Sequence, residues 1–209
     1  MASRLRTGVV GAGVFGGHHA RKHRDAPRIN LAGIYDLDPV RASALAAEIG
    51  VCAYGSYRDL LDDVDAVTIA APAPAHFRMA AGAIAAGKHV YVEKPLALRL
   101  PDADALVAAA EENGVVLQVG HQERFVLAAM GLPRGDQAPL SLEFGRAGPP
   151  TGRGEEVAVA LDLMIHDLDL ARLFGFMNPV KVDACGSYDE TVATLMFEGG
   201  RTASFVASR

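Results

Sequence analysis

The sequence has no tryptophan, only two cysteines and no long apolar run. Cys52 and Cys185 do not form a Cys-x-x-Cys pair, and two cysteines are too few for a disulfide framework. The longest apolar run, around residues 66–75, contains two prolines and is well short of the ~18 residues that a membrane span needs. The sequence therefore argues against a disulfide-stapled secreted domain and against a membrane span.

An excess of basic charge and a leader sequence are missing as well. The 209 residues include 20 Lys and Arg against 25 Asp and Glu, which gives a net charge of −5. Nucleic acids and anionic membrane surfaces attract chains in which basic residues outnumber acidic ones. The apolar stretch after Arg4 and Arg6 is too short for a signal peptide. We therefore expect a cytoplasmic protein that binds neither nucleic acid nor membrane.

The remaining composition is that of a globular chain. Half of the residues are hydrophobic and 22% are charged, whereas a disordered chain is poor in hydrophobic residues and high in net charge. Domains usually take roughly 100–200 residues. The length therefore predicts one large domain or two small ones.

The first half of the chain alternates short apolar segments with helical stretches. Strands are predicted at residues 5–10, 31–35, 65–70, 88–92 and 115–119. Asp38 is a good helix cap, Pro39 suits a first helical position, and Gly50 suits a helix end. Continuously apolar strands between helices are typical of a parallel sheet that is covered on both faces. Residues 1–120 are therefore predicted to form a doubly wound α/β domain of the Rossmann type.

The pattern changes after Gly120. A stretch rich in Gly and Pro runs from Gly131 to Gly154 and contains one strand-like segment, residues 140–144. A helix is expected at 159–174, followed by antiparallel strands at 180–184, 191–197 and 202–207. The last two strands are joined by residues 198–200, which form a hairpin signal. We expect a second domain, of the α+β class with an open sheet, over residues 121–209.

A glycine loop lies between the first predicted strand and the first helix. It reads Gly11-Ala-Gly13-Val14-Phe15-Gly16, and Asp36 ends the next strand twenty residues later. In such a loop the first glycine allows a tight turn, the second a close approach to a pyrophosphate, and the third close packing of helix on strand. The helix N-terminus offers N–H groups to phosphates. The pattern predicts a dinucleotide site that includes Val14 and Phe15.

Asp36 bears on which dinucleotide is bound. A carboxylate at the end of the second strand accepts hydrogen bonds from both ribose hydroxyls of the adenosine and repels a 2′-phosphate. NAD is therefore favoured over NADP. NADP is not excluded, because the helix that follows the glycine loop carries three basic residues, which we interpret as a solvated face: Arg21, Lys22 and Arg24.

A second motif, Glu93-Lys94-Pro95, follows the fourth predicted strand. In open α/β sheets, ligands bind at the carboxyl ends of the strands. A lysine there suits general acid–base chemistry or a hydrogen bond to a substrate hydroxyl. A cis Lys94–Pro95 bond would aim the side chain. The alternative is an ordinary surface lysine before a turn.

A third motif places Asp162 and His166 four residues apart on one predicted helix, where they share a face. A carboxylate and an imidazole on one face suit proton transfer or the binding of a polyol. The alternatives are a surface pair or half of a metal site. No Cys/His pair elsewhere completes such a site, so we expect no metal.

The other histidines carry weaker signals. His76 follows the turn Ala71-Pro72 near the expected cofactor edge, which favours a ribose or nicotinamide contact. His121 and Gln122 follow the last strand of the first domain. His121 is a candidate to contact the substrate, and Gln122 is a candidate to contact the cofactor. Three further histidines fall on the first helix and are interpreted as part of its polar face: His18, His19 and His23.

Together the three motifs, in this order and spacing, resemble the Gfo/Idh/MocA family of oxidoreductases. The resemblance implies an N-terminal dinucleotide domain and a C-terminal sheet that binds substrate and often forms the oligomer. It implies hydride transfer between NAD(P) and a carbon of a sugar, cyclitol or nucleotide sugar. On this sequence it implies catalytic roles for Lys94, Asp162 and His166. It also implies cofactor contacts by Lys94 and by Ala71, Pro72, His76, Glu93 and Gln122.

The segment around Asp162 and His166, residues 157–167, also resembles members that oxidise UDP-N-acetylglucosamine at C3. One departure from the family is that members usually run longer, whereas this chain ends at Arg209, after an expected central strand of the second sheet. We therefore expect a shortened second domain and a homo-oligomer through its sheet. The alternative function is a non-catalytic NAD(H)-binding subunit or sensor with a degraded substrate domain.

Overall fold

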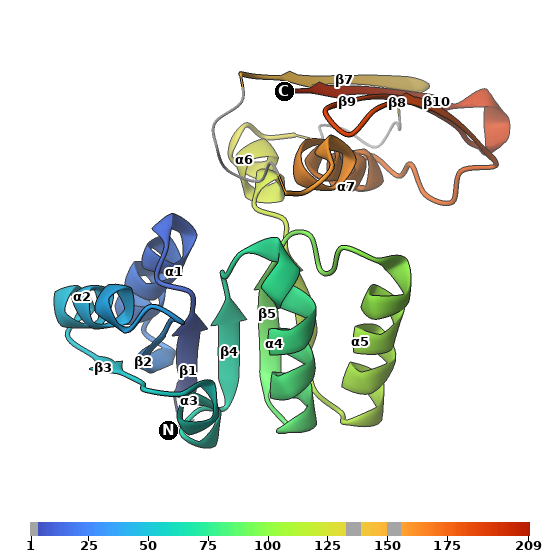
Figure 1. Ribbon diagram of the computed structural model, residues 1–209. Helices are drawn as coiled ribbons and strands as arrows, with labels where there is room; N and C mark the ends of the chain where they lie inside the picture. Colours follow the sequence, from blue (N-terminus) through green and yellow to red (C-terminus); the bar gives the residue numbers. More distant parts are fainter. Residues whose placement is uncertain (1–3, 133–138, 150–155) are drawn as a thin grey trace. The chain divides into compact units, whose positions relative to one another are not determined.

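The computed structural model describes residues 4–132, 139–149 and 156–209. The chain divides into two compact units, Met1–Gly120 and His121–Arg209 (Figure 1). The ranges 133–138 and 150–155 lie outside the described residues, and all of them except residue 155 belong to the predicted Gly- and Pro-rich stretch.

Unit 1 is built on a six-stranded parallel sheet with strand order β3-β2-β1-β4-β5-β6. The chain starts in the middle, builds outward to β3, and then crosses to β4. This order creates a switch point between β1 and β4, where ligands of such sheets bind. The strands are β1 (Leu5–Val10), β2 (Ile29–Tyr35), β3 (Cys52–Ala53), β4 (Ala66–Ile69), β5 (His89–Glu93) and β6 (Leu117–Gly120).

Five helices connect these strands: α1 (Val14–Asp25), α2 (Pro39–Ile49), α3 (Tyr57–Asp62), α4 (Ala73–Ala85) and α5 (Leu100–Glu112). The predicted ends of α2 are confirmed. The Asp38 side chain accepts hydrogen bonds from the N–H groups of Val40 and Arg41, and Gly50 ends the helix with a φ of 82°. Strand β3 and helix α3 are additional elements, and they are the shortest of their kind in the described part of unit 1.

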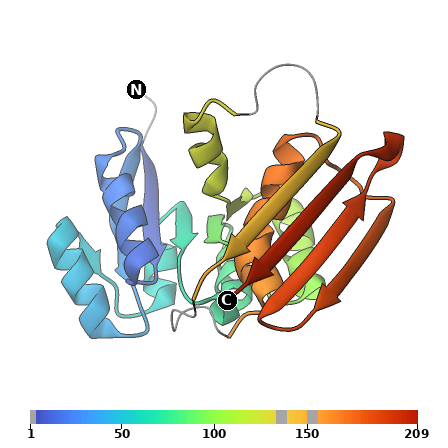
Figure 2. The same cartoon turned by 90° about the horizontal axis from the view of Figure 1, so that it is seen from above.

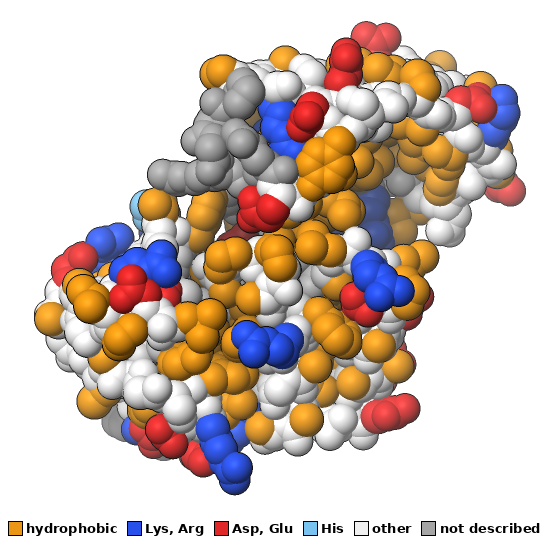
Figure 3. Space-filling view, in the orientation of Figure 1, with side chains coloured by type: hydrophobic (Ala, Val, Ile, Leu, Met, Phe, Trp, Pro, Cys, Tyr) orange, Lys and Arg blue, Asp and Glu red, His pale blue; other side chains and the backbone are white. Residues whose placement is uncertain are grey.

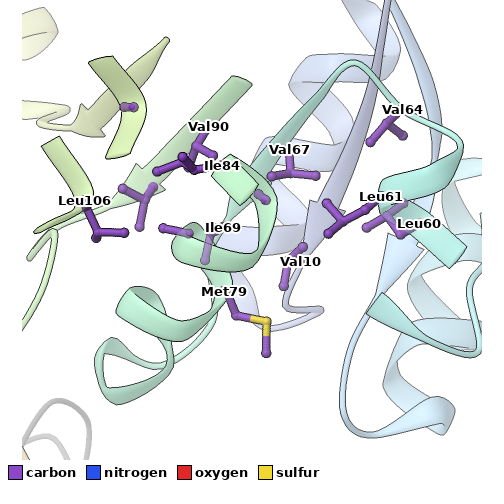
Figure 4. Packing of buried hydrophobic residues seen from close by; sticks show 14 residues of the cluster. Val10, Leu60, Leu61, Val64, Val67, Ile69, Met79, Ile84, Val90 and Leu106 are labelled. Atoms are coloured by element: carbon purple, nitrogen blue, oxygen red, sulfur yellow. The ribbon is translucent and has the colours of Figure 1, made fainter. Parts of the chain in front are cut away.

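Both faces of the sheet are buried, which explains its continuously apolar strands. Successive side chains of β1 point to opposite faces. Val10 packs in one cluster with Ile69 and with Ile84 of α4 (Figure 4). Its neighbour Val9 packs in a separate cluster with Ile34 and with residues of α2. The prediction of a doubly wound sheet is thereby confirmed.

The outer surface of unit 1 carries charges of both signs. On the face seen in Figure 3, Lys and Arg side chains alternate with Asp and Glu, and hydrophobic side chains lie between them. No single sign of charge dominates this face, in keeping with the small net charge of −5.

Unit 2 contains a four-stranded mixed sheet with strand order β7-β10-β9-β8 (Figure 2). Strand β10 is central, parallel to β7 and antiparallel to β9. A 3₁₀ turn, η2 (Glu198–Gly200), joins β9 to β10, where the hairpin was predicted. The strands are β7 (Ser141–Ala147), β8 (Lys181–Gly186), β9 (Glu190–Met196) and β10 (Thr202–Ser208).

Three helical segments accompany this sheet: α6 (Glu123–Ala129), a π-helical turn η1 (Ala160–Met164) and α7 (Ile165–Leu173). Alternate residues of β10 are buried, and the Phe205 ring stacks on Phe144 with centroids 5.3 Å apart. The predicted single helix over 159–174 is wrong in one respect. Its first part is π-helical, with i→i+5 hydrogen bonds, and only the second part is an α-helix.

The expected polar helix face is wrong for two of the three histidines of α1. His18 is exposed, but His19 and His23 are partly buried against the sheet. His23 Nδ1 lies 2.9 Å from the Thr7 hydroxyl, and its Nε2 lies 3.2 Å from the Thr68 hydroxyl. The residues of α1 that are fully buried are small, namely Gly16, Gly17 and Ala20. The helix therefore comes close enough for longer side chains to reach the strands.

Burial, and secondarily the charge of His19, lowers the pKa of His23 to about 4. Between pH 6.5 and about 4, the His23 ring is therefore mostly protonated in the unfolded chain and mostly neutral in the folded one. We predict that the free energy of unfolding of unit 1 falls by about 3 kcal/mol as the pH drops from 6.5 to 4. His23→Gln should remove most of this fall, as measured by urea unfolding across a pH series.

His18→Gln is the matched control, because His18 lies on the same helix but is exposed. It should keep the wild-type dependence of stability on pH. A His23→Gln variant with an unchanged pH dependence would contradict the assignment.

Candidate functional site

The glycine loop between β1 and α1 has two glycines that the fold itself requires. Gly11 has a φ of +98°, and a Cβ there would lie 2.7 Å from the Ala70 carbonyl oxygen. A Cβ on Gly16 would lie 1.8 Å from the Gly11 carbonyl oxygen. A Cβ on Gly13 would meet no heavy atom within 4 Å. Gly13 is thus free of packing constraints, and its surface is open to a ligand.

Asp36 lies at the end of β2 and is hydrogen-bonded to this loop. Its Oδ2 accepts from the Ala12 N–H at 2.7 Å, and its Oδ1 accepts from the Asp38 N–H at 2.8 Å. A carboxylate has about four acceptor positions, so these two bonds leave capacity for ribose hydroxyls. Arg41, in the first turn of α2, lies 3.3 Å from Asp36 Oδ1. Arg41 was not predicted, although its position early in α2 could have indicated it.

The loop region fits a dinucleotide on three grounds. Helix α1 begins at Val14, and its N-cap residue, Gly13, has no side chain that could occupy the N–H groups of the first turn. Asp36 supplies acceptors beside them. A hollow of about 430 Å³ opens at the loop and is lined in part by Gly13, Val14 and Arg41. Arg21, interpreted from the sequence as part of a solvated face, pairs with Glu48 at 2.6 Å and also lines this hollow.

The turns after β4 and β5 hold the next predicted residues. Ala71 is partly buried and Pro72 is exposed. His76 is 1% exposed, and its Nδ1 lies 2.7 Å from the Pro95 carbonyl oxygen while its Nε2 lies 2.8 Å from that of Ala71. Both ring nitrogens therefore contact the backbone. The ring is thus enclosed between two turns, and the expected contact of His76 with a cofactor stays a prediction.

The Glu93-Lys94-Pro95 motif lies at the carboxyl end of β5, as predicted. Lys94 is partly buried, and the Lys94–Pro95 peptide bond is cis. Glu93 Oε1 lies 2.6 Å from Nε2 of His19, and both side chains are mostly buried. Burial, and secondarily the Glu93 carboxylate, raises the pKa of Tyr91 on the same strand. This edge of the sheet thus carries a lysine, a carboxylate and an imidazole.

Unit 2 holds the other motif. Asp162 lies in the π-helical turn η1, and His166 is the second residue of α7 and is 8% exposed. A π-helical turn adds a residue to one turn of the helix, and such turns occur frequently at functional sites. Of the three predicted catalytic residues, Asp162 and His166 therefore belong to unit 2 and Lys94 to unit 1.

Each carboxylate of this helical segment faces an arginine from another element. Asp162 Oδ2 lies 3.6 Å from Arg209 at the end of β10. Two more carboxylates, almost fully buried, are contacted through two guanidinium nitrogens each: Asp167 by Arg146 and Asp169 by Arg124. The hydrogen bonds that Arg146 and Arg124 donate to these carboxylates raise the pKa of both arginines. These pairs offset the cost of burying charge.

Of the other two predicted residues of unit 2, His121 lies beside this cluster, with its Nδ1 3.9 Å from Asp169 Oδ2. Gln122 is exposed at the start of α6. The arginine partners were missed by the sequence analysis, since they come from distant segments and no spacing signal connects them.

Within the described ranges, no group of three or more His, Cys, Asp or Glu could hold a metal ion. Among the same residues, every helix is too short or too polar to cross a membrane.

Comparison with known proteins agrees with this geometry. Residues 5–121 match a family described as "Oxidoreductase family, NAD-binding Rossmann fold". The chain is 40% identical to a UDP-N-acetylglucosamine 3-dehydrogenase from Acidithiobacillus ferrooxidans, over 98% of this chain and 67% of that protein. It is 29% identical to the NAD⁺-dependent scyllo-inositol 2-dehydrogenase of Bacillus subtilis, over 100% of this chain and 68% of that one.

Solved structures give the same result. A structure of the Acidithiobacillus ferrooxidans enzyme superposes with a TM-score of 0.90 at 39% identity, covering 100% of this chain and 71% of that one. A second neighbour is GenD2 from gentamicin A biosynthesis in complex with NAD. Its TM-score is 0.83 at 30% identity, covering 100% of this chain and 66% of that one.

Substitutions at Gly13 and Gly16 test ligand binding and folding separately. We predict that Gly13→Ala leaves the free energy of unfolding within about 0.5 kcal/mol of wild type, because its Cβ meets open space. The same change should weaken NAD binding tenfold or more, since the methyl group occupies the surface that a pyrophosphate approaches. Calorimetric titration with NAD and urea unfolding measure the two effects.

Gly16→Ala is the comparison variant. Its Cβ would overlap the Gly11 carbonyl oxygen, so both stability and NAD binding should fall. A Gly13→Ala variant that binds NAD as tightly as wild type would contradict the placement of the cofactor at this loop.

Proposed function

The chain belongs to the Gfo/Idh/MocA family of oxidoreductases, and we propose that it is an NAD-dependent sugar dehydrogenase. The reaction is hydride transfer between NAD and a hydroxyl-bearing carbon of the substrate. The observation that supports this most strongly is the position of Lys94 at the carboxyl end of β5, on the sheet that also carries the glycine loop and Asp36. The chain spans about two thirds of the length of its curated relatives, and the activity of the whole protein is part of the proposal.

For the substrate we propose a nucleotide sugar of the UDP-N-acetylglucosamine type. The relative with that printed activity is 40% identical, whereas the scyllo-inositol dehydrogenase is 29% identical. Both relatives act on a ring that carries several hydroxyl groups. A free cyclitol is therefore the second candidate, and a substrate panel separates the two.

The proposed catalytic residues are Lys94, Asp162 and His166. NAD, when bound, supplies the acceptor for the hydride. Lys94 or His166 takes the proton from the substrate hydroxyl as the carbon that bears this hydroxyl loses its hydride. Asp162 orients the reacting groups through hydrogen bonds. Such groups contribute by positioning and by acid–base help, and in the reverse direction the same base returns the proton.

The remaining cofactor contacts are proposed from the loop and the turns around it. They comprise Gly11, Gly13, Val14, Phe15, Gly16, Asp36, Ala71, Pro72, Glu93, Lys94 and Gln122. A non-catalytic NAD-binding subunit is not favoured, because Lys94, Asp162 and His166 are all present. The relatives whose names give an activity are dehydrogenases as well.

The homo-oligomer through the sheet of unit 2 stays a prediction. One face of this sheet packs against η1 and α7. On the other face, Val206 of β10 lies opposite Val192 of β9, and their exposures are 44% and 38%. A second copy of the chain is the partner we propose for this face.

Lys94→Ala tests the catalytic proposal. We predict that turnover falls by about 10²–10⁴-fold, the usual contribution of a general acid or base, while the dissociation constant for NAD changes little. Absorbance of reduced nicotinamide measures turnover, and calorimetry measures binding. Lys88→Ala is the matched control, because Lys88 precedes β5 at the opposite edge of the sheet, and it should keep full activity. Retained turnover in Lys94→Ala would remove this residue from the mechanism.

Asp36→Ala tests cofactor choice. Loss of the carboxylate removes two ribose hydrogen bonds and the repulsion of a 2′-phosphate. NAD binding should therefore weaken more than NADP binding, and the preference for NAD should fall about tenfold or more, the effect of one charged hydrogen bond. Asp25→Ala, an exposed change at the end of α1, serves as the control. An unchanged ratio of the two dissociation constants would rule out the ribose role.

A further inference from the structure

Two histidines from different helices contact the residues on either side of Lys94. His19 of α1 contacts the Glu93 side chain, and His76 of α4 contacts the Pro95 carbonyl. Neither contact was expected from the sequence, which suggested a polar helix face for His19 and a ligand contact for His76. The segment that carries Lys94 is thus held from both sides.

The first contact connects Lys94 to the glycine loop. His19 lies in the second turn of α1, the helix that begins at this loop. Its Nε2 is 2.6 Å from Glu93 Oε1, and the exposures of the two side chains are 21% and 12%. The His19 ring also packs edge-on against Tyr91, with centroids 5.3 Å apart. A short hydrogen bond to a carboxylate is among the stronger side-chain contacts, so the Glu93 side chain is fixed relative to α1.

The second contact connects Lys94 to the turn after β4. His76 is almost completely buried, and its two ring nitrogens face the carbonyl oxygens of Pro95 and Ala71 at 2.7 and 2.8 Å. A carbonyl oxygen only accepts hydrogen bonds. A ring nitrogen that carries hydrogen donates to the carbonyl oxygen it faces. Enclosed between the two turns, the imidazole ring holds the backbone directly after Lys94 beside the Ala71-Pro72 turn.

We propose that His19 and His76 are positioning residues for Lys94. They fix the residues before and after it, and they do so from the two segments that frame the carboxyl edge of the sheet, the glycine-loop helix and the β4–α4 turn. A displacement of about 1 Å in a reacting group can cost on the order of 10²-fold in rate. This inference rests on the proposed function for the role of Lys94, but the contacts themselves are testable without activity.

The experiment uses the full chain with His19→Asn, His76→Asn and the control His18→Asn. His18 is adjacent to His19 but exposed. Backbone ¹⁵N relaxation at Lys94 and Leu96 reports whether the segment is held. The order parameters should be near 0.85 in wild type and in His18→Asn, and should fall below about 0.6 in the other two variants.

Kinetics supply the second readout. Each of the two variants should lower kcat by about 10- to 100-fold, as expected for a misplaced reacting group, with the KM for substrate within about threefold of wild type. In the Lys94→Ala background the same substitutions should cost nothing further, because residues that act through Lys94 lose their effect without it. Additive losses would instead indicate a merely structural role and would overturn the proposal.

The remaining outcomes are also decisive. Unchanged order parameters in His19→Asn and His76→Asn would overturn the proposal, whatever the kinetics show. Should His76→Asn fail to fold, the order parameters and the kinetics of His19→Asn still decide. If the wild type turns over no sugar at all, the proposed function fails, while the relaxation data still test whether the two histidines hold the segment.

Discussion

The close approach of helix α1 to the parallel sheet is the constraint on which the site in unit 1 depends. The fully buried residues of this helix are Gly16, Gly17 and Ala20, and at Gly16 even one methyl group would overlap the backbone of the loop. Small residues at this contact allow the helix axis to lie near the strands. As a result the N-terminus of α1 opens at the end of β1, where its N–H groups are available to phosphates.

The same approach gives the histidines of α1 their positions. His23 reaches the hydroxyls of Thr7 and Thr68 on two strands, and His19 reaches Glu93 at the end of a third. A larger residue at the helix–sheet contact would move all of these groups together. The dinucleotide loop and the lysine motif are therefore parts of one packed arrangement within unit 1.

In unit 2 the corresponding constraint is electrostatic. Asp162, Asp167 and Asp169 lie on one helical segment, and each faces a guanidinium from another element. Removing one partner of such a buried pair leaves an uncompensated charge, so the arginines determine where the helix can lie. This arrangement presents His166 and Asp162 from a segment whose other acidic groups are already neutralised.

The sequence was most informative where one physical rule applies within a short window. Apolar runs predicted the central strands of the sheet, and Asp38 with Gly50 predicted both ends of α2. The spacing from the glycine loop to Asp36 predicted a dinucleotide site, whereas the hydrogen bond from the Ala12 N–H to Asp36 was not expected. The two-residue strand β3 was missed because its residues are exposed and carry no pattern.

Prediction failed where distant segments decide the outcome. The contacts of His76 and His19 were not predicted, because their partners, Pro95 and Glu93, come from another part of the chain. The π-helical turn at Asp162 has no residue signature that distinguishes it from the α-helix that follows. The arginines that face the acidic groups of unit 2 were found only in the folded structure, for the same reason.

The most direct test of the account is the fate of one hydrogen atom. The protein is incubated with NAD and UDP-N-acetylglucosamine that carries deuterium at C3, and the nicotinamide is analysed by mass spectrometry. Direct hydride transfer predicts that reduced NAD gains one deuterium for each sugar oxidised. Reduced NAD without deuterium, or an oxidised sugar without reduced NAD, would contradict the central claim that this chain passes a hydride between a sugar carbon and its nicotinamide cofactor.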